Sequence, residues 1–352
     1  MIDCGRAAYL SLQVVCSENI LNTNRVVGTS ILLLAAFVLA PLAHADIGAS
    51  TGSATTYSGR AIAVSVHIPS LADLAIADTG DLPPSGGEND ATVLTVNNEL
   101  VQAEVLLSVT TGFDNAASST AAIADLVLLP GSQNQITADF VKSDTTVTCN
   151  SASASSEIVG LQVAGSTIVV TGSPNQVVNT PVGTLTINSQ SISQGSTNSA
   201  TAIALDLLLL NGDEIKVSFA HSDITCGSLP QPTVTKDFMT GGGFIVVNGV
   251  KDTFGFVAGF KPGETSPSGH LNYIDHQSGD HIQSISVDSY TGSGVCRTFS
   301  GPGTDNGQQT NYSVSACDNA DSGNGSDTFE MQLSNNYQPS GTLGGGNIKL
   351  HT

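Results

Sequence analysis

Positive charge is scarce in this chain of 352 residues, and tryptophan is absent. Lysine and arginine together number 10, against 30 aspartates and glutamates, which gives a formal net charge of −20. So few basic residues cannot line a continuous basic groove, and the composition therefore excludes nucleic acid and anionic membrane surfaces as partners. An acidic chain is suited to solubility outside the cell and to attracting cations.

Charged side chains of both signs make up only 11% of the sequence, whereas a typical soluble protein has ~25%. Hydrophobic residues reach 40%, which is enough to build a core and excludes a disordered chain. Much of the remainder is glycine, serine, threonine and asparagine. This mixture is typical of short strands joined by turns.

One strongly apolar run stands near the start, where residues 31–42 read ILLLAAFVLAPL. The run has the length of a signal-peptide core and is too short to span a bilayer. The small residues of AHA at 43–45 follow it, so we expect residues 1–45 to be a signal peptide cleaved after Ala45. The segment before Leu21 lacks the usual short basic start, and we expect translation to begin at Leu21 rather than at Met1. The C-terminal NIKLHT has no hydrophobic tail, so no membrane anchor is expected there.

Cysteine is rare as well. Six are present, and two of them lie in the expected leader. The other four are Cys149, Cys226, Cys296 and Cys317, and none belongs to a Cys-x-x-Cys pair. An even number of cysteines in an oxidising compartment predicts two disulfides and argues against a zinc or redox site.

Two segments resemble each other and suggest how the cysteines pair. Residues 122–149 read AIADLVLLPGSQNQITADFVKSDTTVTC, and residues 202–226 read AIALDLLLLNGDEIKVSFAHSDITC. We expect the corresponding strands to lie side by side and to bring Cys149 to Cys226, which leaves Cys296 for Cys317. The first bond closes a long loop, so it should stabilise the fold by ~4 kcal/mol on the chain-entropy model.

Period-2 alternation recurs along the chain and predicts strands with one face toward a core. The alternating sets are Ile62, Val64, Val66 and Ile68; Phe254, Phe256, Ala258 and Phe260; and Phe329, Met331 and Leu333. We therefore predict an all-β protein, with an antiparallel β-sandwich-like domain at 46–227 and a smaller antiparallel β-barrel or roll at 238–352.

A linker is predicted at 228–237, where SLPQPTVT carries two prolines and no apolar periodicity. Glycine triplets at 241–243 and 344–346 stand near the two ends of the second domain. Triplets beside strands permit bulges and close backbone approach. We expect these two strands to pair and to close the small barrel.

Short motifs in the first region occur in a recognisable order. They are GRA at 59–61, ADTGDLP at 77–83, GSPN at 172–175 and TINSQ at 186–190, followed by the two Cys-terminated strands. In this order they resemble the choice-of-anchor P family of extracytoplasmic bacterial domains. The region 240–350, with GGGFI, TFGFVAGF, GHLNYIDH and LGGGNI, is similar to the β domain that often follows it. The resemblance implies an exported protein whose relatives are held at the surface by varied C-terminal devices, and it implies no reaction. This chain ends without such a device, which leaves free secretion or attachment through a partner open.

Two groups of residues are candidate metal ligands. His270, His276 and His281 occur close together, and the turn at 277–279 could return His281 beside His276, so they could bind a transition metal. Asp318, Asp321, Asn324 and Asp327 lie in a glycine-rich segment with many oxygen donors, which could bind calcium. Each group has a simpler interpretation as the polar end of a hairpin, and the second fits no EF-hand spacing.

Motifs for catalysis are weak. Asp78-Thr79-Gly80 matches the aspartic-protease triplet, but the candidate second copy at 321–323 has different surroundings. Neither a G-x-S-x-G elbow nor a glycine loop followed by a helix is present. We therefore expect no enzyme, no catalytic residue and no cofactor other than calcium.

The function expected from the sequence is a secreted or cell-surface structural or adhesion module of unknown ligand. The alternative is an extracellular protein that binds calcium or glycan, although the lack of tryptophan disfavours glycan. A secreted hydrolase is the third interpretation. Partners would be surface, matrix or protein components, contacted mainly by loops.

Overall fold

The computed structural model describes residues 53–69, 71–228, 236–320 and 325–352. The expected signal peptide and most of the expected linker lie outside these residues. Every regular element within them is a β-strand, and the 22 strands form three antiparallel sheets, so the predicted all-β class is confirmed. Within the described ranges, no helix has the length and apolar character needed to cross a membrane.

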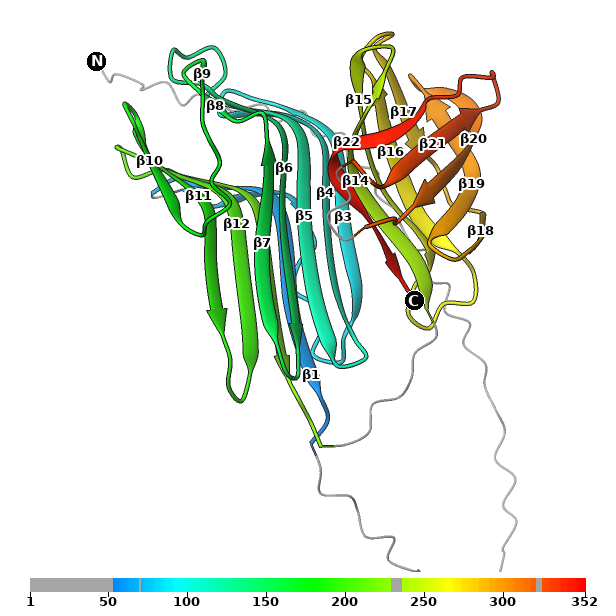
Figure 1. Ribbon diagram of the computed structural model, residues 1–352, viewed down its shortest axis with the longest axis horizontal. Helices are drawn as coiled ribbons and strands as arrows, with labels where there is room; N and C mark the ends of the chain where they lie inside the picture. Colours follow the sequence, from blue (N-terminus) through cyan, green and yellow to red (C-terminus); the bar gives the residue numbers. More distant parts are fainter. Residues whose placement is uncertain (1–52, 70, 229–235, 321–324) are drawn as a thin grey trace, which may run out of the picture.

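The first two sheets come from the N-terminal part of the chain (Figure 1). Sheet A has the spatial order β10 (Gln176–Thr180), β11 (Gly183–Ser193), β12 (Asn198–Leu209), β13 (Glu214–Thr225), β1 (Thr56–His67) and β2 (Leu74–Asp78). Sheet B has the order β3 (Gly87–Asn97), β4 (Val101–Phe113), β5 (Ala116–Leu128), β6 (Ile136–Thr148), β8 (Gln162–Val163) and β9 (Ser166–Thr167), with β7 (Ala152–Val159) also paired to β6.

Sheets A and B lie against each other through a shared hydrophobic core, with β5 and β6 facing β12 and β13. Fully buried members include Leu106 and Ile123 from sheet B and Leu205 and Val217 from sheet A. Burial of such side chains contributes most of the favourable free energy of folding. Some polar groups between the sheets are paired across them; for example, the Ser218 hydroxyl donates to the Ala121 carbonyl at 2.6 Å.

The two similar segments occupy different sheets. Residues 122–149 supply β5 and β6 in sheet B, and residues 202–226 supply β12 and β13 in sheet A. The expectation that corresponding strands lie side by side is therefore wrong, because the two hairpins stack face to face. Cys149 and Cys226 nevertheless form a disulfide, as expected, across a sequence separation of 77 residues. This bond joins the ends of the two stacked hairpins.

The first strand departs from its predicted alternation. Val64 and Val66 face the core, but so do Ala61 and Ala63, and Ile62 lies half-buried on the outer face. The pairing of β1 with β13 is irregular at this level, where Ser218 has a φ of +57°. Ala63 and Ser218 are the pair missing from this otherwise regular ladder, at the point where the alternation of β1 changes side.

Sheet C contains the C-terminal strands and closes into an eight-stranded antiparallel barrel. Its order is β17 (Asp280–Ser284), β16 (Ser268–Asp275), β15 (Val250–Phe260), β14 (Asp237–Val247), β22 (Ser340–His351), β21 (Thr328–Leu333), β20 (Gln308–Cys317) and β19 (Cys296–Asp305), with β18 (Ser289–Ser293) beside β19. Pairing of β17 with β19 completes the ring. The second disulfide joins Cys296 and Cys317 on neighbouring strands, as expected.

Aromatic rings fill the barrel, with Phe254 stacked on Phe329 at 4.1 Å between ring centroids. The two glycine triplets lie on β14 and β22, and these strands pair as the sequence predicts, with Gly243 opposite Gly346. Gly346 has a φ of +107°, and a Cβ there would overlap the carbonyl oxygen of Gly242. Glycine is therefore required at this crossing for backbone conformation and for space.

Candidate functional site

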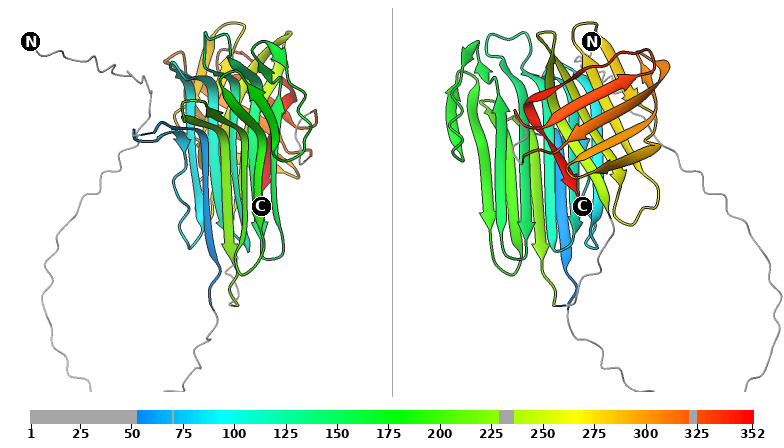
Figure 2. Two further views of the ribbon diagram at one scale, coloured as in Figure 1. Left: turned by 90° about the vertical axis from the view of Figure 1, so that its left-hand side faces the viewer. Right: turned by 45° about the vertical axis from the view of Figure 1, so that its right-hand side comes forward.

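The barrel packs against the outer face of sheet B, through β15 on β4, β14 on β5 and β22 on β6 (Figures 1 and 2). Two apolar patches make this contact. One contains Leu107 and Val109 with Phe238 and Val257, and the other contains Ala122, Phe140 and Phe244. Glycine brings the backbones close, because a Cβ on Gly255 would lie 2.8 Å from the Val105 side chain. The two units are therefore in direct, close-packed contact.

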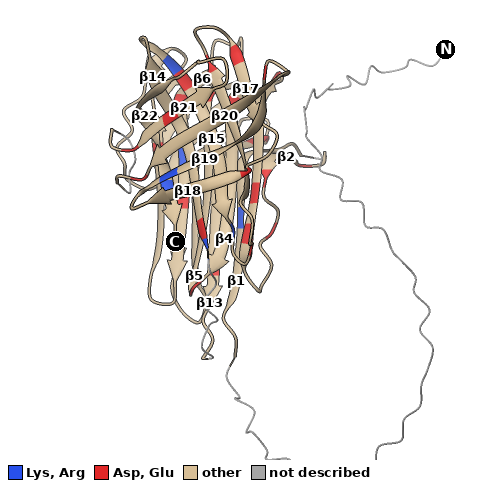
Figure 3. Ribbon diagram, turned by 90° about the vertical axis from the view of Figure 1, so that its right-hand side faces the viewer, with Lys and Arg blue, Asp and Glu red and all other residues tan. Residues whose placement is uncertain are grey.

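Charges of opposite sign flank these apolar patches. The barrel side carries Lys236, Lys251 and Lys261, and their partners on sheet B are Asp114, Asp139 and the pair Glu88 and Asp90. Figure 3 shows the few basic positions in blue among the more numerous acidic ones in red. Seven of the eight lysines and arginines in the described ranges form ion pairs. Three of those seven lie at the contact between barrel and sheet B.

The most buried of these ionic groups surrounds Lys261, which follows β15. Its Nζ lies 3.0 Å from a Glu88 carboxylate oxygen and 2.6 Å from Asp90, both on β3. His270 on β16 lies 3.3 Å from the same Asp90. Burial of the Glu88 side chain, followed by the repulsion of Asp90, raises its pKa to about 7. Burial also lowers the pKa of His270, because a desolvated site disfavours the charged form of each group.

A second ionic group lies at the opposite end of β16. Nε2 of His276 is 3.0 Å from Oε2 of Glu104 on β4 and 3.4 Å from Oδ2 of Asp125 on β5. One ligand atom from each residue lies within 4.8 Å of the other two. The Glu104 carboxylate raises the pKa of His276, and burial raises the pKa of Asp125.

Irregular backbone directs both carboxylates toward His276. The register of β4 against β5 shifts on either side of Glu104. Val105 and Asp125 have φ values of +45° and +43°, which are uncommon for residues with a side chain. Bulges of this kind turn individual side chains away from the regular alternation and are frequent beside functional sites.

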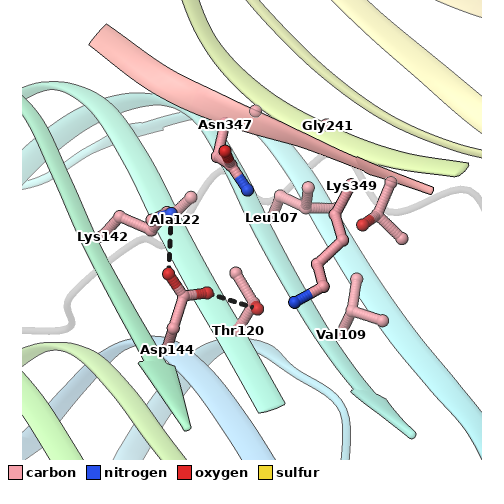
Figure 4. A pocket seen from close by; sticks show the side chains of 11 residues that line it. Leu107, Val109, Thr120, Ala122, Lys142, Asp144, Gly241, Asn347 and Lys349 are labelled. Carbon is pink, nitrogen blue, oxygen red and sulfur yellow. Dashed lines mark hydrogen bonds and ion pairs between the residues drawn. The ribbon is translucent and has the colours of Figure 1, made fainter. Parts of the chain in front are cut away.

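A small cavity of about 20 Å³ lies between strands β4 to β6 of sheet B and strands β14 and β22 of the barrel (Figure 4). The Lys142 ammonium pairs with Asp144 at 2.6 Å, and the Thr120 hydroxyl donates to the same carboxylate at 2.6 Å. Lys349 and Asn347 line the cavity from the barrel, and Oδ1 of Asn347 is buried without a hydrogen-bond partner in the described part of the chain. The volume is large enough for one water molecule.

The structure separates the three histidines that were expected to act together. His270 lies with Asp90 and Lys261, and His276 lies with Glu104 and Asp125. The predicted turn at 277–279 does form, but β17 pairs His281 with Ile274 rather than with His276. Among the described residues, the potential metal ligands grouped with His276 are Glu104 and Asp125 rather than His270 and His281. The hairpin register and the facing acidic residues give each ring a different environment.

The predicted calcium ligands are described only in part, since Asp321 and Asn324 lie outside the described residues. Asp327 is fully buried, and its Oδ1 accepts hydrogen bonds from the backbone N–H groups of Asn319 and Ala320. Its Oδ2 accepts from the Ile348 N–H at 2.7 Å. Asp318 accepts from the Leu350 N–H at 2.9 Å. Both carboxylates therefore hold the turn against β22 through backbone amides.

The protease-like triplet also has a structural explanation. Asp78 accepts two hydrogen bonds from the Arg60 guanidinium, at 2.9 and 2.6 Å, and a third from the Gly80 N–H. This bidentate pair lowers the pKa of Asp78 and keeps it ionised. The arrangement anchors the end of β2 to β1.

Sequence reasoning missed Glu104 and Asp125 as site residues. Each is a lone carboxylate inside an otherwise apolar strand, in VQAEVLLSV and AIADLVLL. A charged residue at such a position is rarely buried without a partner, so this pattern was an available signal. It could not have identified His276 as that partner, because the contact joins residues ~150 or more positions apart and depends on how two sheets pack.

No family model matches the chain, and no curated protein matches it. Among solved structures, a "putative AttH" from Nitrosomonas europaea is similar over 89% of this chain and 99% of its own, with 8% identity and a TM-score of 0.19. A likeness this weak carries no argument about fold or function. The interpretation of the site therefore rests on its own geometry.

Proposed function

We propose that this protein is an exported, non-catalytic structural or adhesion module in which a sandwich-like domain and a barrel act as one rigid body. The observation that carries the proposal is the contact between the two units. It combines two apolar patches with complementary ion pairs, and Lys261 between Glu88 and Asp90 is the most buried of these. A contact of this kind resists hinge motion and suits a component that bears load or presents a fixed surface.

The distribution of charge supports the same proposal. The chain has 30 acidic residues against 10 basic ones, and most of the described basic residues are paired with carboxylates of the protein itself. Acidic residues such as Glu99, Asp288 and Glu330 face solvent, which favours cationic or neutral partners over nucleic acid. Two disulfides fit an extracellular protein, and export through the peptide at 1–45 is part of the proposal.

The resemblance to choice-of-anchor P proteins adds the expectation of a location at the cell surface. Attachment to the surface through a partner is part of the proposal. Long polar strands such as β7 and β11 expose serine and threonine, and their edges and the connecting loops are the surfaces we expect such a partner to contact.

Cell fractionation tests this proposal. We expect immunoblots of the producing bacterium to place the protein with cells or their matrix, and we expect the purified protein to bind the same cells when it is added back. Assays of polymer breakdown run on the same samples should show no turnover above that of a heat-denatured control. A freely diffusing protein that degrades a polymer would contradict the proposal and favour the hydrolase alternative.

A further inference from the structure

We propose that Glu104, Asp125 and His276 bind one divalent transition-metal ion, with zinc as the best match, at the contact between sheet B and the barrel. Two ligands come from neighbouring strands of sheet B, and the third follows β16 of the barrel. The ion would therefore join the two units directly. This inference does not depend on the proposed function, because it rests on the geometry of three side chains.

The donor types suit zinc. An imidazole nitrogen and two carboxylate oxygens are ligands that Zn²⁺ accepts at bond lengths of about 2.0–2.2 Å. Around a tetrahedral ion with such bonds, ligand atoms lie roughly 3.3–3.5 Å apart. The Nε2 atom of His276 lies 3.0 Å from the Glu104 oxygen and 3.4 Å from the Asp125 oxygen. These two separations are close to the tetrahedral values, and one ligand atom from each carboxylate lies within 4.8 Å of the other.

One of the two distances is long for a hydrogen bond. Charge-assisted N–H···O bonds are usually about 2.7–2.9 Å long, and the contact with Asp125 is 3.4 Å. Oε2 of Glu104 is buried and has no hydrogen-bond partner of good geometry in the described part of the chain. Its nearest polar neighbour is Nε2 of His276, at 3.0 Å. A cation held between the two would give this oxygen a direct ligand bond.

The backbone supports these ligand positions. Register shifts flank Glu104, and both Val105 and Asp125 have positive φ values. Asp252 accepts a hydrogen bond from the His276 N–H at 3.2 Å, so the residue is held where β16 ends. Ligands fixed in this way lose little conformational freedom when an ion binds.

Binding has a defined proton balance. A metal ion binds only the neutral imidazole, so Nε2 of His276 has to give up any proton that it carries. The ion takes the lone pair of Nε2, and that proton leaves to solvent. Three protein ligands leave a fourth tetrahedral position for water. Zinc affinity should therefore rise with pH.

The test uses the exported protein, purified without an affinity tag and stripped of metal. Titration calorimetry with zinc chloride should show one site, and cobalt(II) bound in its place should give the intense visible absorption of a tetrahedral complex. His276→Gln and Asp125→Asn should each weaken zinc binding by more than about 100-fold, since even loss of an outer partner of a metal ligand costs 10–100-fold. His281→Gln is the matched control, because His281 lies outside the cluster, and it should bind zinc as the wild type does.

Melts of the metal-free proteins show whether each variant is folded before it is titrated. Zinc should raise the melting temperature of the wild type and of His281→Gln by a few degrees. The melting temperatures of His276→Gln and Asp125→Asn should not change with zinc. If His276→Gln folds and binds zinc as the wild type does, the ion lies elsewhere and the proposal is overturned. Absence of heat, of a thermal shift and of the cobalt spectrum in the wild type would overturn it equally.

Discussion

Nζ of Lys261 lies 2.6 Å from Oδ1 of Asp90, although 171 positions separate the two residues. The contact joins the end of a barrel strand to the edge strand of sheet B. It belongs to a largely buried group in which Glu88 is only 2% exposed and Lys261 18% exposed. Removing one partner from such a group leaves the others desolvated and uncompensated.

Lys261→Met should therefore destabilise the protein by ~3 kcal/mol, because it leaves the Glu88 and Asp90 carboxylates without their cation. Lys216→Met is the matched control, since Lys216 pairs with Glu214 on the outer surface at 2.7 Å, and we expect a change below ~1 kcal/mol. Urea unfolding of both variants would measure the difference. Equal losses would show that the contact contributes no more than a surface pair.

Glu88 should also make stability depend on pH. Its pKa rises from 4.5 to about 7 on folding, so the folded state binds the proton more tightly than the unfolded state does. The contribution of Glu88 protonation to the free energy of unfolding is fully present below pH ~4.5 and is lost as pH rises to ~7. Its total is ~3 kcal/mol, because each unit of pKa shift is worth ~1.4 kcal/mol.

Glu88→Gln removes this titration. The free energy of unfolding of the variant, minus that of the wild type, should therefore increase by ~3 kcal/mol between pH 4.5 and 8. Urea unfolding at several pH values measures this difference, and other titrating groups cancel in the comparison. A difference that does not change with pH would show that Glu88 ionises normally in the folded protein.

Neighbouring glycines in the paired triplets should respond differently to substitution. Gly346→Ala should cost at least ~2 kcal/mol, because the position has a φ of +107° and a Cβ would overlap backbone. Gly242→Ala is the control, since a Cβ there would make ordinary contacts at 3.5 Å with Ala122 and Leu107. We expect the free energy of unfolding of Gly242→Ala to be within ~1 kcal/mol of that of the wild type. Thermal melts would compare the two.

Excess calcium should leave the melting temperature unchanged, and so should a calcium chelator. Both oxygens of Asp327 accept backbone hydrogen bonds, which satisfies the carboxylate without an ion. Asp327→Asn should destabilise the protein by ~2 kcal/mol, because an amide NH₂ would face backbone donors. A calcium-dependent rise in the melting temperature would contradict this prediction and make the turn at 318–327 the first target for mutagenesis.

Several features could be read from local sequence. Alternation of Phe329, Met331 and Leu333 identified a strand whose side chains fill the barrel. The glycine triplets identified the pairing of β14 with β22. The cysteine count predicted two disulfides, and both expected pairs form, although the hairpins that carry Cys149 and Cys226 stack rather than lie side by side. These features could be predicted because the alternation of side chains along a strand, the conformational freedom of glycine and the chemistry of cysteine are properties of short segments.

The arrangement of the hairpins and the content of the site were decided by tertiary structure. Similar sequences place two hairpins in opposite sheets, because either pairing buries the same apolar faces and only the packed core selects one. Ile62 lies outside the core because the alternation of β1 changes side at the gap in its pairing with β13. Glu104, Asp125 and His276 met because sheet B and the barrel pack together. Local chemistry determined strands, turns and disulfides, whereas long-range packing determined which charged groups became neighbours.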